Sequence, residues 1–119
     1  MERLKPPDDI SPLDFFTNWV PNAVATDETR RSRLDSTNAT VVFELSGEQG
    51  GTYTVEIADG VVRGAEGPVD NPDLKVEIDI DTWRQLNRGD ISAPEALLKR
   101  RVKLHGDFLL GLKLHLILG

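Results

Sequence analysis

The sequence predicts an α+β domain, because helical spacing is found towards both ends of the chain and strand alternation fills the middle. The 119 residues suffice for one domain and are too few for two ordinary ones. Apolar residues make up 39% and charged residues 29%, which is typical of a folded globular protein. Residues 1–10 are charged and proline-bearing, so we expect a disordered tail followed by one domain of residues 11–119.

The first helix is predicted to begin at Ser11, which can cap it, with Pro12 in its first turn. Its apolar face is formed at helical spacing by Phe15, Phe16, Trp19 and Val20. Pro21 is expected to end or kink this helix, because proline has no backbone N–H to donate. A second short helix is predicted to open at residues 26–28, with its arginine run (Arg30, Arg31, Arg33) on the helix surface.

Four strands are predicted in the middle of the chain, at residues 41–45, 53–57, 61–63 and 74–80. Alternation places Val41, Phe43 and Leu45 on one face of the first strand. The pair Asp59-Gly60 predicts a two-residue hairpin turn, since both of its positions need positive φ. The fourth strand alternates apolar with charged residues, which predicts a half-buried antiparallel strand with one solvated face.

The last third returns to helix. Asp81 is predicted to cap a helix that carries Trp83 and ends at Gly89, and Ser92 opens another with a capping box. Residues 102–104 alternate as a further strand. The final segment, residues 108–118, fits both strand alternation and a helical apolar face, and Asp107 as a cap with the unbroken apolar run favours helix.

Catalytic and metal sites are poorly supported by the sequence. The absence of cysteine excludes disulfides, thiolate metal sites and cysteine nucleophiles. His105 and His115 lack the spacing of a structural zinc site. A His105–Asp107 dyad in a hydrolase is one alternative, and a solvent-facing histidine at a strand end is the one we favour. We expect that the protein is not an enzyme and that it binds neither a metal nor a cofactor.

Three carboxylates at alternate positions, Glu77, Asp79 and Asp81, are predicted to share one sheet face. They suggest a divalent cation site, but we favour a solvated strand face, since calcium loops need more oxygen ligands in a tight turn.

The charge balance is acidic, with 14 basic and 20 acidic residues and a net charge of −6. It argues against nucleic acid as a partner and allows at most transient membrane contact. We expect a cytoplasmic protein, because the N-terminus has no signal-like apolar stretch and the 11-residue run 108–118 is shorter than the ~20 residues of a membrane span. One basic cluster, Lys99, Arg100, Arg101 and Lys103, is either an anchor for a carboxylate, a CoA phosphate or an anionic membrane, or a solvated turn.

Three stretches carry a resemblance to a known family. They are VVFELSGEQGGTYTVEIADGVV, with a strand, a glycine-rich turn and a DG hairpin; DLKVEIDIDTWRQLNRGDISAPEAL, with an alternating strand, a tryptophan-bearing helix and Ser-x-Pro-x-x-Ala; and RVKLHGDFLLGLKLHLILG, with a Gly-Asp entry into a leucine-rich helix. In this order, over residues 41–119, they resemble the sterol carrier protein type 2 domain family in its prokaryotic stand-alone form. The chain departs from that family at residues 99–101, where relatives often carry glycine.

The resemblance implies a five-stranded, mainly antiparallel sheet with helices on one face, and an apolar tunnel between them that holds a lipid. Members bind sterols, fatty acids or fatty acyl-CoA, and some are domains of larger enzymes. The expected function is therefore a non-catalytic intracellular lipid carrier. The alternative is a structural or interaction domain that packs on a partner lipid-metabolising enzyme and keeps a residual cavity.

Apolar side chains of the helices and of one sheet face are the candidate tunnel lining. From the residues alone they predict an ordinary packed core, and the resemblance reverses that preference. They are Phe15, Phe16, Trp19, Phe43, Val55, Ile57, Trp83, Leu86, Leu97, Leu98, Phe108, Leu109, Leu112 and Leu116. Arg101 and Lys103, which alternation puts on one strand face, are the candidates for a ligand head group. An empty tunnel of ~400 Å³ would cost ~10 kcal/mol, so we expect it to be occupied, hydrated or partly collapsed.

Overall fold

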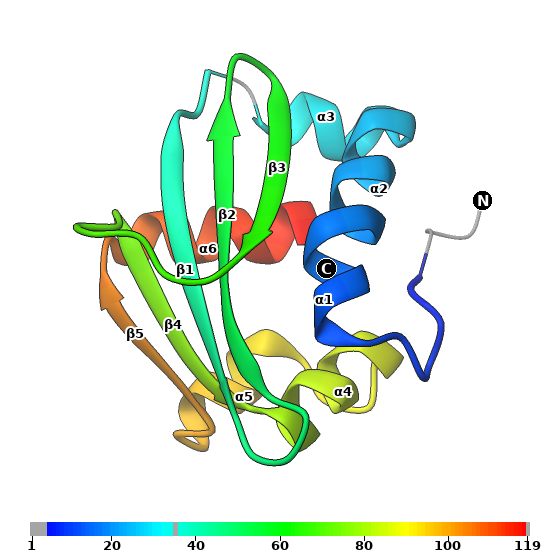
Figure 1. Cartoon of the computed structure of the whole chain (residues 1–119), viewed down its shortest axis with the longest axis vertical. Helices are drawn as coiled ribbons and strands as arrows, with labels where there is room; N and C mark the ends of the chain where they lie inside the picture. Colours follow the sequence, from blue (N-terminus) through cyan, green and yellow to red (C-terminus); the bar gives the residue numbers. More distant parts are fainter. Residues whose placement is uncertain (1–4, 35, 119) are drawn as a thin grey trace.

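The computed structural model describes residues 5–34 and 36–118, with side chains described as far as residue 115. Five strands form one sheet in the order β3-β2-β1-β4-β5 (Figure 1). They are β1 (Ala39–Ser46), β2 (Gly51–Ala58), β3 (Val61–Glu66), β4 (Leu74–Asp79) and β5 (Val102–Gly106). Three pairings are antiparallel and β1 pairs with β4 in parallel, so the prediction of a five-stranded, mainly antiparallel sheet is confirmed, with a mixed sheet as the refinement.

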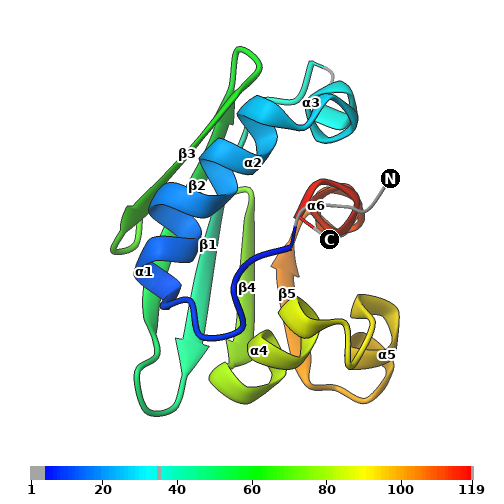
Figure 2. The same cartoon turned by 90° about the vertical axis from the view of Figure 1, so that its right-hand side faces the viewer.

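The helices of the described residues lie on one face of the sheet (Figure 2). They are α1 (Pro12–Asp14), the π-helical segment η1 (Phe15–Trp19), α2 (Val20–Thr26), α3 (Glu28–Leu34), α4 (Ile80–Arg88), α5 (Ala93–Leu98) and α6 (Phe108–Leu118). η1 and α2 pack on β3, α4 and α5 lie at the end of the sheet where β5 begins, and α6 packs against α3, β4 and β5. The α+β architecture is therefore confirmed.

The first helical run does not end at Pro21, and that part of the prediction is wrong. It continues from residue 12 to residue 26, with the five-residue π segment η1 directly before Val20 and Pro21. The Val20 N–H donates to the Phe15 carbonyl, five residues back. In an α-helix the ring of Pro21 would collide with the carbonyl four residues earlier, that of Thr17. Thr17 lies within η1, and the wider π turn leaves room between its carbonyl and the proline ring. The chain thus accommodates Pro21 without leaving the helix.

The boundary between β4 and α4 also differs from the prediction. Strand alternation continues in the sequence to Ile80, but the strand ends at Asp79, which caps α4 in place of Asp81. The Asp79 carboxylate accepts hydrogen bonds from the Thr82 N–H at 3.0 Å and the Thr82 hydroxyl at 2.5 Å. Burial raises the pKa of Asp79, but these hydrogen bonds and the charge of Arg101 outweigh burial and hold the pKa below its usual value.

The caps predicted for the other helices are confirmed. Ser11 and Ser92 accept hydrogen bonds from the backbone N–H three residues later. Gly89 ends α4 with a φ of 82°. Asp107 accepts a hydrogen bond from the Leu110 N–H at 3.2 Å, and the ambiguous final segment is a helix.

The core lies between the sheet and the helices, and β1 contributes Val41, Phe43 and Leu45 to it, as predicted. η1 comes very close to the sheet at Gly64 of β3, where a Cβ would lie 1.8 Å from the Phe16 carbonyl oxygen. Only glycine fits there, so Gly64 sets how near η1 comes to the sheet.

One charged side chain also enters the core, and its prediction as helix surface is wrong. Arg30 is only 1% exposed. Its guanidinium is 2.9 Å from the Asp27 carboxylate and lies over the Trp19 ring, 5.4 Å from the ring centroid. A buried arginine is tolerated when it is paired in this way.

Candidate functional site

The space between η1, the sheet and α4 is filled by an aromatic cluster. It consists of Phe15, Phe16, Trp19, Phe43, Tyr53 and Trp83. The Phe16 ring centroid lies 4.9 Å from that of Phe43 and 5.1 Å from that of Tyr53. The Phe15 ring lies nearly perpendicular to that of Trp83, with centroids 5.2 Å apart, and stacks on Trp19 at 5.5 Å. The structure thus brings five of the predicted lining residues together as rings in mutual contact. Tyr53, the sixth, shares the inward face of β2 with Val55 and Ile57.

The terminal helix α6 has apolar side chains on two opposite sides, with Lys113 and His115 between them, and it is covered on one of these sides. Leu110 and Leu114 are buried, and Gly111 lies against Leu104, where a Cβ would be 3.0 Å from a Leu104 methyl. On the other side, Phe108 is 54%, Leu109 75% and Leu112 47% exposed. Adjoining large apolar side chains that are exposed to water commonly mark a contact site, so these three residues, the uncovered α6 face, are a candidate contact surface for an apolar ligand or partner.

The remaining lining candidates are divided between the interior and the surface. Val55 and Ile57 are buried in the core cluster, and Leu86 and Leu97 are half-buried. Leu98, at the end of α5, is 85% exposed. The side chain of Leu116 lies outside the described residues.

Of the two head-group candidates, Lys103 lies on the face of the sheet that points away from the helices, and Arg101 lies directly before β5. Val102 and Leu104 of β5 pack against the core, so Lys103 between them faces outward, opposite Glu77 of β4. Arg101 lies close enough to Asp79 to lower its pKa. Each of the two cations therefore lies close to a carboxylate, Lys103 to Glu77 and Arg101 to Asp79.

His105 pairs with Glu77 and not with Asp107. The Nε2 of His105 is 2.5 Å from Oε2 of Glu77, and this hydrogen bond lowers the pKa of the Glu77 carboxyl. The Asp107 carboxylate caps α6 instead. Across the described part of the chain, no three metal-ligating side chains come together.

Helix α4 carries buried polar atoms without hydrogen-bond partners in the described structure. They are Trp83 Nε1, Gln85 Oε1 and Asn87 Nδ2. Trp83 and Asn87 are four residues apart and so share one side of α4, while Gln85 lies on the other side. A buried donor without an acceptor is costly, so an oxygen atom of a ligand or of water beside Trp83 and Asn87 would be stabilised. Asn87 is not among the residues predicted from the sequence, where its one signal is its position one helical turn after Trp83.

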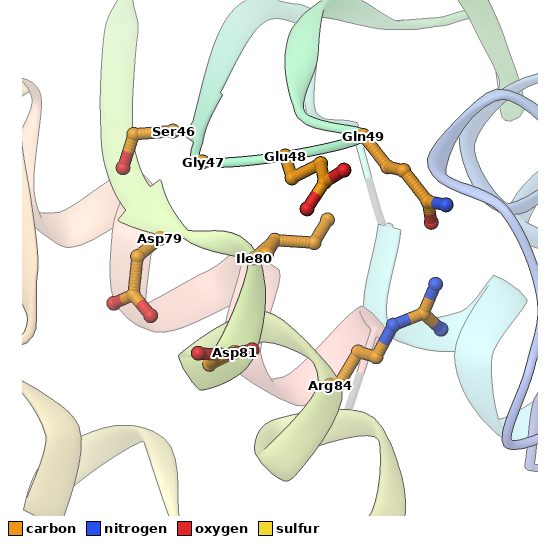
Figure 3. Close-up of a pocket in the computed structure, with 8 residues that line it drawn as sticks. All are labelled: Ser46, Gly47, Glu48, Gln49, Asp79, Ile80, Asp81 and Arg84. Atoms are coloured by element: carbon orange, nitrogen blue, oxygen red, sulfur yellow. The ribbon is translucent and has the colours of Figure 1, made fainter.

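A pocket of about 520 Å³ opens on the surface between the β1–β2 turn and the start of α4 (Figure 3). It is lined by residues 46–49, 79–81 and Arg84, and the Arg84 guanidinium points towards the Gln49 side chain (Figure 3). Arg84 also donates to the carbonyls of Asp8 and Ile10, which ties the segment before α1 to α4. The lining is polar and rich in carboxylates, so this pocket differs from the apolar tunnel that the resemblance implies and is unsuited to an acyl chain.

None of the helices in the described residues has the length and apolar character that a bilayer crossing requires.

Comparison with known proteins gives a family match over most of the chain. A model of the SCP-2 sterol transfer family matches residues 21–119. Human hydroxysteroid dehydrogenase-like protein 2 is 29% identical over 108 residues, which cover 83% of this chain and 26% of that protein. The chain spans between 21% and 26% of the length of the curated relatives it matches.

Two solved structures show the same fold at low sequence identity. The sec-alkylsulfatase Pisa1 from Pseudomonas sp. superposes with a TM-score of 0.69 and 21% identity, over 92% of this chain and 16% of that one. Palmitated SCP2L2 from Aedes aegypti superposes with a TM-score of 0.64 and 15% identity, over 87% of this chain and 94% of that one. One neighbour is therefore a large enzyme, and the other is of about the size of this chain.

Proposed function

The chain belongs to the SCP-2 sterol transfer family, and on that basis we propose that it is a non-catalytic intracellular carrier of a fatty acid, a fatty acyl-CoA or a sterol-like lipid. The observation that carries this proposal is the uncovered α6 face. Three large apolar side chains in water are unfavourable by about 25 cal/mol for each Å² exposed, and an apolar ligand chain that covers them removes that cost. The structural relative SCP2L2, solved in palmitated form, supports a fatty acid as one ligand class.

The lipid chain is proposed to lie against the uncovered α6 face, with Leu86 and Leu97 as further contacts. The inner lining candidates, including Val55, Ile57 and the aromatic cluster, would meet it only where the packed rings separate. This agrees with the expected cost of an empty tunnel, because rings in mutual contact avoid a large void. Loading would therefore exchange contacts within the protein for contacts with the lipid.

Two measurements test the carrier function. Native mass spectrometry after gentle purification should show a co-purified lipid.

Leu112→Asp should abolish binding of a fluorescent fatty acid, because it places an unpaired charge in the apolar contact. Leu13→Asp is the matched control, since Leu13 on α1 is 46% exposed, against 47% for Leu112. Unchanged affinity of a folded Leu112→Asp variant contradicts the role of α6.

The polar end of the lipid has two candidate sites. Arg101 and Lys103 are the pair that the sequence suggests for an anionic head group. The buried donors of Trp83 and Asn87 are the pair that the structure suggests, and their chemistry suits a carboxylate or a hydroxyl oxygen.

Charge substitutions separate these two sites. Asn87→Asp should weaken a fatty acid about tenfold if α4 holds the head group, and should spare a fatty alcohol, whose hydroxyl can donate to the new carboxylate. Gln85→Glu, on the other side of α4, is its control. Charge reversal at Arg101 and Lys103 should weaken the fatty acid by a similar factor if the basic pair holds it, and added salt should reduce the difference. A loss in one variant identifies the site, and no loss in either contradicts both.

A second candidate function is that of an interaction domain on a lipid-metabolising enzyme. It is favoured by the relatives in which this domain is a small part of a longer chain, hydroxysteroid dehydrogenase-like protein 2 and the alkylsulfatase. The uncovered α6 face would then pack on the partner, with a residual cavity beneath it. A clean ligand-free mass together with stable complexes supports this function over the carrier, whereas a co-purified lipid supports the carrier.

A further inference from the structure

The turn between α5 and β5 combines the most exposed leucine of the described residues with consecutive basic side chains. Leu98 is 85% exposed, and Lys99 and Arg100 directly after it are exposed as well. We call these three residues the α5–β5 tip. It lies at the end of the molecule away from α2 and α3 (Figures 1 and 2).

The tip lies in a basic stretch of an otherwise acidic protein. Residues 95–103 contain four basic side chains and one carboxylate, whereas the whole chain has a net charge of −6. Arg101 and Lys103 lie close to the carboxylates of Asp79 and Glu77, so the charge of the tip comes from Lys99 and Arg100. Lys99 pairs with the one carboxylate of this stretch, Glu95, at 2.9 Å, and the pair is exposed. Within the described residues no ion pair is found for Arg100. A single exposed leucine is ordinary, but one followed directly by two exposed basic residues presents an apolar side chain and cations on the same surface.

The backbone of the tip gives a second, independent observation. Arg100 has a φ of +58°, in the left-handed region. Its N–H donates to the Leu97 carbonyl, and the N–H of Arg101 donates to the Ala96 carbonyl, which is the Schellman pattern of a helix end. Glycine is the usual residue at this position because a side chain is strained there. The chain keeps a large cation where glycine would be relaxed, and such strain points to a use for the side chain.

We propose that the α5–β5 tip docks on the surface of an anionic lipid bilayer. Leu98 enters the apolar layer below the head groups, and Lys99 and Arg100 contact the phosphates. The acidic remainder of the protein is repelled by the same surface, so the protein approaches with the tip first. This surface is separate from the uncovered α6 face, so membrane docking does not depend on the proposed carrier function.

Cosedimentation with phosphatidylcholine vesicles, with and without phosphatidylglycerol, measures this docking. Binding should require phosphatidylglycerol and weaken as salt rises. Leu98→Ser should weaken it about tenfold, and each cation removed should weaken it about fivefold. Leu13→Ser on α1 is the apolar control and Arg31→Gln on α3 the charge control, and both should bind as the wild type does.

Arg100→Gly is the decisive variant. It removes one cation and also relaxes the backbone, so vesicle binding should fall about fivefold while the thermal midpoint rises. If Arg100 affected docking only through the stability of the tip, vesicle binding and the thermal midpoint would change in the same direction. Fatty acid binding in solution should be unchanged in this variant, which separates docking from the lipid site. The proposal is overturned if the protein binds both vesicle types equally, or if Arg31→Gln loses as much binding as Arg100→Gly. It is also overturned if the protein binds neither vesicle type, and the tip would then be a contact surface for an acidic protein.

Discussion

The two ends of the helical layer are covered in opposite ways. Over β2 and β3, the segment η1 lies so close to the sheet that only a glycine fits beneath it, and its phenylalanines are enclosed by other rings. Over β5, the helix α6 buries Leu110 and Leu114 and leaves its other side exposed. The first region is completed by the chain itself, whereas the second presents apolar surface to something outside the chain.

This difference indicates where stability and binding reside. A close-packed region responds to any change of volume, because its side chains have no alternative positions. A half-covered helix can shift, because much of its surface touches nothing. We therefore expect substitutions near η1 to change the free energy of unfolding and substitutions on the outer side of α6 to change lipid binding.

Truncation of a ring gives the largest contrast. Phe16 is buried against Phe15, Phe43, Tyr53 and Trp83, so Phe16→Ala should lower the free energy of unfolding by about 3–5 kcal/mol. Leu109→Ala, on the uncovered α6 face, should change it by less than about 0.5 kcal/mol. Urea unfolding measures both. Similar losses in the two variants would mean that α6 is covered in solution as fully as η1.

Filling the close contact at β3 should give the next largest loss. The added Cβ in Gly64→Ala would lie 1.8 Å from the Phe16 carbonyl oxygen, and backbone atoms can relieve that overlap only by moving η1 off the sheet. We expect a loss of about 2–3 kcal/mol in urea unfolding, at the upper end of overpacking costs. Gly60→Ala is not a suitable control because Gly60 has positive φ, and Ala65→Ser on the same strand serves instead. A loss below about 1 kcal/mol would contradict the rigidity of this contact.

The sequence predicted the features that depend on near neighbours. The caps at Ser11, Ser92 and Asp107 and the turn at Asp59-Gly60 need only the residues beside them, and all are confirmed. The end of β4 was misplaced because apolar alternation continues through Ile80, while the capping bonds to Thr82 that end the strand carry no periodic signal.

Features that depend on distant contacts were not predictable. Pro21 is retained within a helix by a π turn. Arg30 is buried because it pairs with the Asp27 carboxylate and lies over the Trp19 ring. The apolar residues of the predicted lining look alike in sequence, yet Phe16 is enclosed and Leu109 is exposed. Which of them is covered depends on what packs against each helix, and a list of apolar positions does not contain that information.

The pH dependence of stability should report the cap that joins the sheet to α4. The folded-state pKa of Asp79 lies below its unfolded value, so its contribution is fully present above the unfolded pKa and is lost as pH falls through the folded one, below about pH 4. Asp79→Ala should cost about 1 kcal/mol at neutral pH, as for other helix caps, and should flatten the acid limb of a stability-against-pH curve. Glu56→Ala, an exposed carboxylate of β2, is the control. An unchanged acid limb in Asp79→Ala would show that Asp79 does not carry this dependence.

The smallest expected effect comes from Gly111 of α6. It tests whether α6 is packed on β5 less rigidly than η1 is on β3. A Cβ at Gly111 would lie 3.0 Å from a methyl of Leu104, which is the end of a half-buried side chain and can move. Alanine is favoured over glycine inside a helix by about 0.5–1 kcal/mol, so Gly111→Ala should be neutral or should raise the free energy of unfolding by up to that amount. The same substitution at Gly64 meets backbone and is costly. A loss above about 1 kcal/mol in Gly111→Ala would mean that α6 is seated on β5 as rigidly as η1 is on β3, and would remove the freedom to shift that the proposed lipid site requires.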